Sequence, residues 1–236
     1  IENGMTPATI VDDSPVTFGT WSPVNYTGKF SGPVTLRKAL ENSLNVVAVK
    51  VADQVSIDKA LYYAQQMGIS TLVLRGNVND RNLAAALGGL TRGVTPLEIA
   101  SAFGVLANQG VRAEPVAILK VVDRHGRVLE QHTPRHKVVL NERSAYILAD
   151  MMRGVITNGT GMAANIGRPA AGKTGTTSDY KDAWFVGFTP DLVAAVWIGH
   201  DNEGTLNGLT GGTIPAIIWR DFMAAAHEGI PVHDFP

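Results

Sequence analysis

The chain has 236 residues, 45% of them hydrophobic, a formal net charge of −1 and no cysteine. This length allows one large domain or two small ones with a real core, and the lack of cysteine excludes disulfides, cysteine-ligated zinc and cysteine nucleophiles. No run of Lys and Arg interleaved with aromatic residues occurs, so a nucleic-acid partner is not expected. No apolar stretch is long enough to span a bilayer and no signal-peptide pattern opens the sequence.

The first part of the sequence predicts an extended arm followed by helices. Residues 1–34 are rich in Pro, Gly, Ser and Thr, which favours an ordered, extended arm. Residues 35–110 form a helical region. Thr35 and Ser56 are expected to cap two of its helices, and Gly68 to end the second of them.

The middle of the sequence predicts one further helix and a hairpin. Thr95-Pro96-Leu97-Glu98 is a capping box with proline in the first turn, and the helix it opens is expected to run to Gly110. Residues 111–140 are interpreted as a hairpin insertion, because two strand-like segments flank the turn Arg124-His125-Gly126.

The last part, residues 141–236, predicts a helix, a sheet and a final helix. Glu142–Thr157 is strongly amphipathic. Three apolar stretches then read as antiparallel strands: residues 170–177, 183–189 and 192–199. The final helix, opening at Thr213, is apolar almost all round and is therefore expected to be covered on most sides. The fold class is α/β of the α+β type, with an antiparallel sheet flanked by helices beside a helical subdomain.

Lys173-Thr174-Gly175-Thr176 is the most informative tetrad in the chain. On an edge strand, alternation turns Thr174 and Thr176 to one side, so that two hydroxyls can meet a carboxylate together. Gly175 lets a ligand approach the backbone closely, and Lys173 supplies positive charge for an anionic substrate. An ordinary exposed edge strand is about equally compatible with these four residues alone.

Ser43-Leu44-Asn45 is a second, weaker signal. Ser and Asn compete for backbone hydrogen bonds inside helices, so the string suggests a break between two helices that presents both side chains to a cleft. Without further support a plain helix cap would explain it better.

Together, the two motifs resemble the S-x-N and K-T-G motifs of penicillin-recognising enzymes. The chain further resembles, over nearly its whole length, the transpeptidase domain of class A (bifunctional) penicillin-binding proteins. On this resemblance residues 1–236 are a single, partial transpeptidase domain. The strings that carry it are Thr6–Asp13, Trp21–Tyr26, Ser43–Ala48, Leu87–Gly89, Gly93–Glu98, Gly172–Thr177 and Lys181–Gly187.

The resemblance implies a D,D-transpeptidase that cross-links peptidoglycan stem peptides through a serine acyl-enzyme and is inhibited by β-lactams. Ser43 would pass a proton to the leaving group, Asn45 would bind the substrate amide, and Lys173 would hold Ser43. The substrate-binding group would be Thr174, Gly175, Thr176 and Thr177. No cofactor and no metal site is implied, and the six histidines, which show no ligand spacing, are expected at the surface or in turns.

The sequence departs from the family pattern in one large respect. The family carries its nucleophile in an S-x-x-K segment upstream of S-x-N. Two S-x-x-K strings occur in this chain, and both are rejected. Ser56–Lys59 reads as a capped helix start that faces solvent, and Ser178–Lys181 reads as a solvated loop. The chain is therefore expected to lack the nucleophile, to be inactive alone, and to leave an apolar cavity where that helix would pack.

The resemblance also implies what lies outside the chain. The expected missing partner is the N-terminal part of the same protein, with the S-x-x-K helix, a glycosyltransferase domain and a membrane-anchoring helix. That anchor would place the domain on the extracytoplasmic side of the bacterial cytoplasmic membrane. Two alternatives stay open: a serine D,D-carboxypeptidase or β-lactamase, and a non-catalytic module that binds peptidoglycan peptides.

Overall fold

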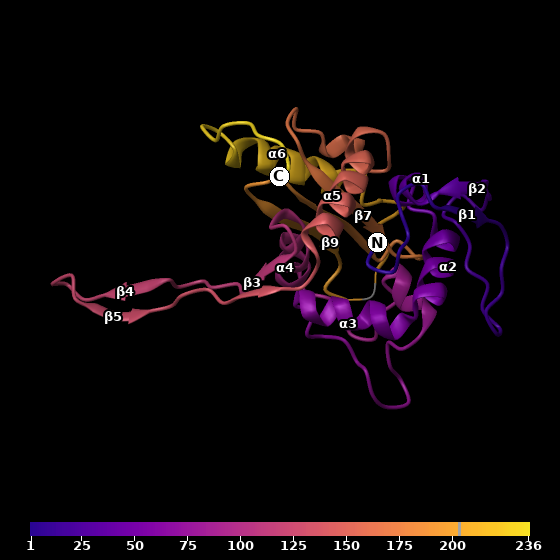
Figure 1. Cartoon of the computed structure of the whole chain (residues 1–236), viewed down its shortest axis with the longest axis horizontal. Coiled ribbons are helices and arrows are strands. Elements are labelled where there is room, and N and C mark those ends of the chain that lie inside the picture. The colour runs from indigo at the N-terminus through magenta and orange to yellow at the C-terminus, as the bar shows by residue number, and fades with distance from the viewer. Residues whose placement is uncertain (203) are drawn as a thin grey trace.

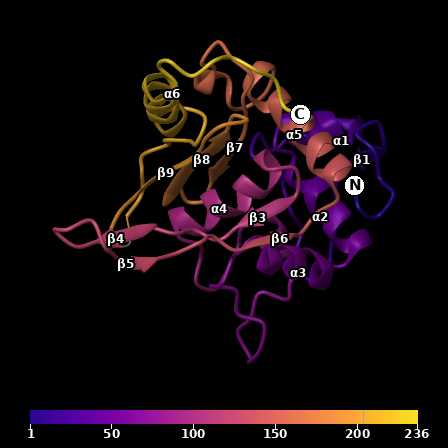
Figure 2. The same cartoon turned by 60° about the vertical axis from the view of Figure 1, so that its left-hand side comes forward.

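The computed structural model describes residues 1–202 and 204–236. Helices flank an antiparallel sheet, and further helices lie beside it in the N-terminal half (Figures 1 and 2), which confirms the predicted α+β fold. The described elements are β1 (Ile10–Asp13), β2 (Gly32–Thr35), α1 (Leu36–Glu41), α2 (Asn45–Val55), α3 (Ile57–Met67), η1 (Leu83–Leu87), α4 (Pro96–Ala107), β3 (Val111–Ala113), β4 (Lys120–Val122), β5 (Val128–Gln131), β6 (His136–Val138), α5 (Glu142–Thr157), η2 (Met162–Ala164), β7 (Ala171–Thr176), β8 (Asp182–Phe188), β9 (Val193–Gly199) and α6 (Ile214–Ala226).

The N-terminal part folds as a short β1–β2 ladder followed by helices. Thr35 caps α1, because its hydroxyl accepts the Lys38 N–H, and Gly68 ends α3 in the left-handed conformation. The prediction for Ser56 is wrong. Ser56 precedes α3 with φ of +82°, and its side chain makes no capping hydrogen bond. Its backbone N–H bonds to Asp53 O instead, so Ser56 is a sharp corner between α2 and α3.

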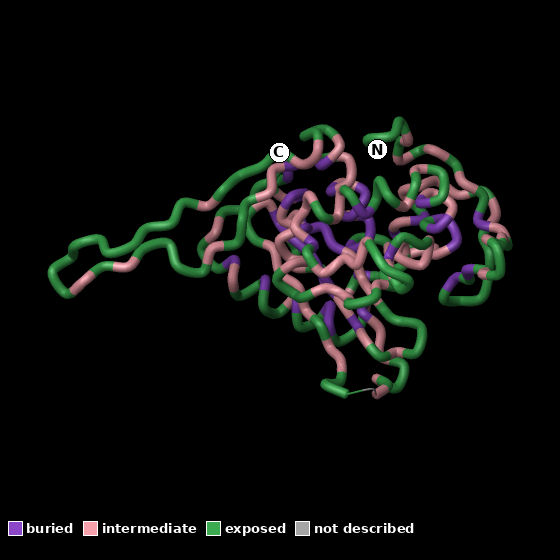
Figure 3. The backbone as a smooth tube through the Cα atoms, turned by 90° about the horizontal axis from the view of Figure 1, so that it is seen from below, coloured by how far each residue is buried: buried purple, intermediate pink, exposed green. Residues whose placement is uncertain are grey.

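The capping box of α4 is present in both directions between Thr95 and Glu98. This helix ends at Ala107, before the predicted Gly110, because the backbone leaves the helical conformation at Asn108 and both Gln109 and Gly110 have positive φ. Gly110 also packs against the Leu140 carbonyl, where no side chain would fit. Beyond it β3 pairs with β6, and β4 pairs with β5 in a hairpin that projects far from the body (Figures 1 and 3).

The sheet β7-β8-β9 is antiparallel and packs against helices on both faces. Alternation along β8 turns Phe185 toward α6, where it meets Trp219, and Phe188 toward α4 and α5. Both aromatic side chains are fully buried. Strand β7 has β8 on one side only, so it lies at an edge of the described sheet with one row of backbone groups free.

The prediction that α6 is covered on most sides is wrong. Ala216, Trp219 and Met223 are fully buried against the sheet, and the Trp219 indole N–H donates to Gly187 O and Ala194 O. The opposite face remains open, with Phe222 58% exposed and Ile218 45% exposed. An apolar sequence shows that a helix could be buried all round, but the number of elements that pack against it is a property of the tertiary structure.

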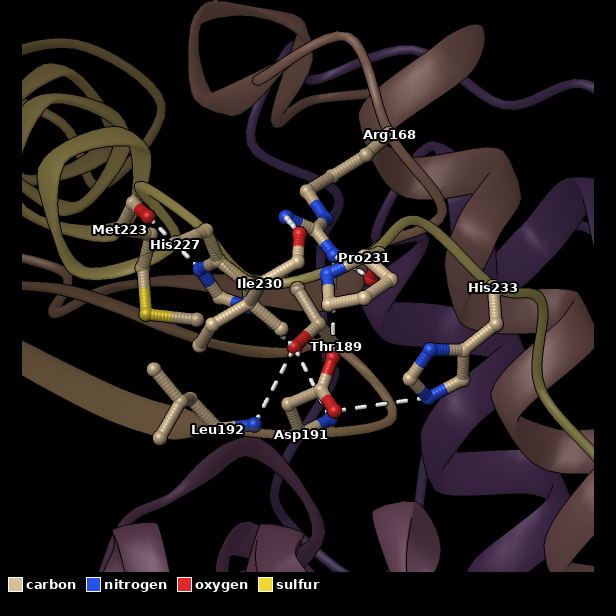
Figure 4. Close-up of polar contacts among 9 residues, drawn as sticks. All are labelled: Arg168, Thr189, Asp191, Leu192, Met223, His227, Ile230, Pro231 and His233. Atoms are coloured by element: carbon tan, nitrogen blue, oxygen red, sulfur yellow. Dashed lines mark hydrogen bonds and ion pairs between the residues drawn. The ribbon is translucent and has the colours of Figure 1, made fainter.

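His227 lies in the turn that follows α6, as the sequence predicted, but its side chain is buried. Its Nδ1 lies 2.7 Å from the Met223 carbonyl oxygen, so this nitrogen carries the proton, and its Nε2 accepts from the Thr189 hydroxyl at 2.8 Å. Thr189 Oγ1 in turn accepts the amides of Asp191 and Leu192 (Figure 4). The ring thus joins the end of α6 to the β8–β9 turn.

We expect Trp219→Ala to lower the free energy of unfolding by about 3–5 kcal/mol, because it opens a cavity between α6 and the sheet. Phe222→Ala, on the exposed face of the same helix, is the matched control and should change stability by about 0.5 kcal/mol or less. Urea unfolding of the chain measures both, and equal losses would contradict this account of α6.

Candidate functional site

Ser43 occupies a strained position in the break between α1 and α2. Helix α1 ends in a Schellman motif, in which the Leu44 N–H bonds to Ala39 O and the Ser43 N–H to Leu40 O. Such motifs place glycine in the left-handed conformation, but here Ser43 stands there with φ of +53°. The break therefore holds a hydroxyl where the backbone would prefer glycine, a kind of strain that clusters at functional sites.

The Ser43 hydroxyl meets Lys173 of β7 across a separation of 130 residues. Lys173 Nζ donates to Ser43 Oγ at 2.7 Å and to Thr174 O at 3.1 Å. Burial of the ammonium disfavours its charged form and lowers the pKa of Lys173 to about 8. The structure thus brings the two motifs into one site, where a lysine with a lowered pKa is hydrogen-bonded to a serine.

The N-terminal arm holds Asn45, the first residue of α2, in place. Its Nδ2 donates to Val24 O at 2.9 Å, and the next residue, Val46, donates its N–H to Asn25 Oδ1 at 3.2 Å. The Asn25 amide nitrogen bonds to both oxygens of the fully buried Asp13 carboxylate at 2.9 Å. Residues of the arm therefore anchor the start of α2.

Two hydroxyls of β7 lie on the opposite wall. Thr174 Oγ1 lies 2.7 Å from Thr160 Oγ1, and Thr176 Oγ1 accepts the Gly211 N–H at 3.1 Å. Because the Thr177 N–H bonds across the ladder to Asp182 O, alternation turns the Thr176 N–H toward the free edge. The edge therefore offers two hydroxyls and a backbone N–H, which suit a carboxylate and an oxyanion.

Thr177 is arranged differently from the other predicted residues. Its hydroxyl accepts the N–H groups of Lys181 and Asp182, which folds the β7–β8 loop back on itself. Thr177 is exposed and does not line the cavity that Lys173, Thr174, Gly175 and Thr176 share with Ser43 and Asn45. Its substrate-binding role stays a prediction.

The cavity continues from these polar groups into an apolar region between α1, α2 and α5. Its volume is about 460 Å³. The six predicted site residues just named form its polar wall, whereas the remainder is mainly apolar and includes Leu40, Val47, Val51, Leu87, Leu148 and Met151. The predicted apolar cavity is therefore present beside the motifs.

Neither S-x-x-K string of the chain reaches this cavity. Lys59 is exposed on α3 and donates to Asn3 Oδ1, and Ser178 lies in the exposed β7–β8 loop. Among the residues that the structure describes, no group of three or more His, Asp or Glu side chains is arranged to hold a metal ion.

Thr160, Tyr26 and Tyr180 make side-chain contacts at the site that the sequence did not predict, although Gly159-Thr160-Gly161 resembles a family string expected to form a tight backbone turn near the cleft. Thr160 touches Thr174, and the tyrosine hydroxyls of Tyr26 and Tyr180 bond at 2.9 Å between the arm and the β7–β8 loop. Gly159-Thr160-Gly161 was a possible signal for the first, since two glycines around one polar residue mark a close backbone approach. The tyrosine pair joins segments 154 residues apart, and no local pattern predicts such a contact.

The comparisons with known proteins agree with this geometry. The family described as penicillin binding protein transpeptidase domain matches residues 1–224. The chain belongs to this family. It is 38% identical over 244 residues to penicillin-binding protein 1A of Neisseria meningitidis, a match that covers 97% of the chain and 30% of that protein.

Two solved structures show the same fold. Penicillin-binding protein 1A of Haemophilus influenzae superposes with a TM-score of 0.89 at 25% identity, over 100% of this chain and 41% of that one. PonA1 of Mycobacterium tuberculosis, solved in complex with penicillin V, gives 0.87 at 28% identity over 100% and 67%. The chain thus spans about a third of the length of its curated relatives.

We expect Ser43→Gly to be more stable than Ser43→Ala by about 1 kcal/mol. Both substitutions remove the hydroxyl, but only glycine adopts φ of +53° without strain. Chemical unfolding of the two variants measures the difference. An alanine variant as stable as the glycine variant would show that the break is not strained.

Lys173 should make stability depend on pH in alkaline solution. Its pKa is about 8 in the folded chain against 10.5 ordinarily, so the unfolded state binds more protons between these values. The free energy of unfolding should therefore rise as pH increases from about 8 to 10.5. Lys173→Met should lose this component, which shows as a difference between the two stability curves. Superimposable pH dependences would contradict the lowered pKa.

Proposed function

We propose that the chain forms the substrate-binding part of a D,D-transpeptidase that cross-links peptidoglycan stem peptides through a serine acyl-enzyme. The observation that carries this proposal is the Lys173–Ser43 contact at 2.7 Å, which joins the two motifs beside the threonine hydroxyls of β7. Membership of the transpeptidase family supports the reaction class.

In the proposed reaction a nucleophilic serine attacks the carbonyl between two terminal D-alanines and gives its proton to the lysine of its own Ser-x-x-Lys segment. That lysine would replace the proton that Lys173 passes on, so that one proton moves from the serine to the leaving nitrogen. The carbon–nitrogen bond breaks, and the departing D-alanine needs a proton on its nitrogen. Ser43 would deliver that proton, and Lys173 would hold the Ser43 hydroxyl and restore the proton it gives up. A pKa near 8 suits Lys173 to this exchange, because both of its forms are accessible near neutral pH. An amine from a second stem peptide then takes the acyl group and releases the serine.

The other residues would bind and orient the donor peptide. Asn45 would bond to its amide, Thr174 and Thr176 would bind its terminal carboxylate, and Gly175 lets it approach the backbone of β7. The free N–H of Thr176 would contribute to the oxyanion hole. Thr177 is assigned to the same wall, although its hydroxyl serves the loop in the structure.

The nucleophile belongs to the remainder of the protein in this proposal. A Ser-x-x-Lys helix would fill the apolar cavity and bring its serine to Ser43 and Lys173, which explains why apolar side chains line a space beside polar groups. β-Lactams would enter by the same route and stop at the acyl-enzyme, and the related PonA1 has been solved in complex with penicillin V.

The proposal also extends to the remainder of the protein and its location. We assign to it the Ser-x-x-Lys helix, a glycosyltransferase domain and an N-terminal membrane anchor, so that the domain would act on the outer side of the bacterial cytoplasmic membrane. The curated relatives are about three times as long as the match, which leaves room for such parts. In the part of the chain that the structure describes, no helix combines the length and the apolar character needed to cross a membrane.

Labelled penicillin incubated with this chain should give no covalent adduct by intact mass, because neither of its Ser-x-x-Lys serines lies at the site. In a domain completed with a Ser-x-x-Lys segment, Ser43→Ala or Lys173→Ala should slow acylation by about 10²–10⁴-fold. Thr157→Val, on the surface of α5, is the control and should leave acylation unchanged.

Two results would count against the proposal. An adduct on the bare chain would place a nucleophile where we assign none, and a completed domain that is never acylated would favour a non-catalytic binding module. Product analysis with and without an amine acceptor separates the transpeptidase from a carboxypeptidase or β-lactamase, which use water.

A further inference from the structure

The turn that follows α5 touches both walls of the site. The Thr160 N–H donates to Glu41 O at 3.1 Å, and Glu41 ends α1 two residues before Ser43. The Thr160 hydroxyl lies 2.7 Å from the Thr174 hydroxyl on β7. One residue therefore links the backbone that leads to Ser43 with a hydroxyl on the opposite wall.

The backbone of this turn is held in place by close packing. A Cβ at Gly159 would overlap the Glu41 carbonyl, and a Cβ at Gly212 would overlap the Thr160 carbonyl. The Gly161 N–H bonds back to Val155 O at 2.9 Å and so closes the end of α5. With its main chain fixed in this way, Thr160 has little freedom to follow a moving Thr174.

The hydrogen bonds of the Thr174 and Thr176 hydroxyls explain what the contact between Thr160 and Thr174 does. The Thr176 hydroxyl oxygen already accepts a backbone N–H from Gly211, which leaves its own proton for an anion. At 2.7 Å either hydroxyl can be the donor. An anion that takes the Thr174 proton selects the direction in which the Thr160 hydroxyl donates to Thr174, and Thr174 then reaches the same condition. Chains of this kind polarise one another, so the Thr174 proton becomes a better donor to a negative charge.

We propose that Thr160 is a positioning residue that fixes the direction of the Thr174 hydroxyl, so that Thr174 and Thr176 bind the terminal carboxylate of the donor peptide as a pair. This inference rests on the proposed function and deepens it. Thr160 itself acts through Thr174. Removal of the Thr160 hydroxyl should therefore weaken binding of the terminal carboxylate and leave the other contacts of the peptide intact.

Three variants of this chain test the idea. Thr160→Val keeps the shape and the backbone N–H but removes the hydroxyl, whereas Thr160→Ser keeps the hydroxyl. Thr157→Val is the matched control, because the exposed Thr157 hydroxyl bonds only to Arg153 O and to the Asn158 side-chain amide, and neither contact reaches Thr174. Each variant is first checked for unchanged folding by its amide NMR spectrum.

The first measurement needs no ligand. Three-bond couplings to the Thr174 γ-methyl report its side-chain rotamer, which should be single in the unsubstituted chain, in Thr160→Ser and in Thr157→Val. In Thr160→Val the rotamer should average, because no partner holds the hydroxyl. The second measurement is NMR titration with N-acetyl-D-alanyl-D-alanine and with its C-terminal amide. Thr160→Val should bind the carboxylate peptide about tenfold more weakly and the amide peptide equally well.

The outcomes separate this inference from the proposed function. A single Thr174 rotamer in Thr160→Val would overturn the inference. Equal weakening of both peptides, or a loss in Thr160→Ser as large as in Thr160→Val, would also overturn it, while peptide binding by the unsubstituted chain would still support the proposed function. An unsubstituted chain that binds neither peptide would refute the proposed function and, with it, the carboxylate role of Thr160.

Discussion

The contact between the Lys173 ammonium and the Ser43 hydroxyl is the interaction on which the site depends. It joins the edge strand of the sheet to the break between two helices, and so it sets the spacing of the two walls. Burial disfavours the charged form of Lys173 and lowers its pKa to about 8. The Ser43 hydroxyl and the Thr174 carbonyl accept the hydrogen bonds that the ammonium donates. A lysine with water around it would offer neither the fixed geometry nor the lowered pKa.

The residues around this contact include a strained backbone position and several glycines at which two backbone segments pack closely. Ser43 stands in the left-handed conformation, and glycines at positions 159, 211 and 212 let segments meet where any side chain would overlap a neighbour. Such positions lower stability, because strain and glycine both favour the unfolded chain. Their concentration around one groove is consistent with selection for a geometry at the expense of stability.

Apolar surface is distributed unevenly over the molecule. The sheet is covered on both faces, by α6 on one side and by α4 and α5 on the other, yet the outer face of α6 and the cavity beside Ser43 remain open. The absence of a Ser-x-x-Lys helix predicted the cavity, whereas the apolar sequence of α6 predicted that this helix would be covered. Both predictions concern which elements pack against an apolar surface, and only the first had a sequence motif to guide it.

Local pattern determined most of the elements, because caps and periodicity act within a few residues of one another. Thr35, Gly68 and the capping box at Thr95 stand where their chemistry requires. The sequence also identified two motifs: Lys173–Thr176, whose residue types suit an anionic substrate, and Ser43–Asn45, whose Ser and Asn interrupt a helix. The family resemblance led us to expect that Lys173 holds Ser43, and the tertiary structure supplies that contact. Only the tertiary structure decided that His227 is buried against Thr189 and that Thr160 reaches Thr174. These contacts join segments 14 to 130 residues apart, and nothing in the local sequence encodes the packing that brings them together.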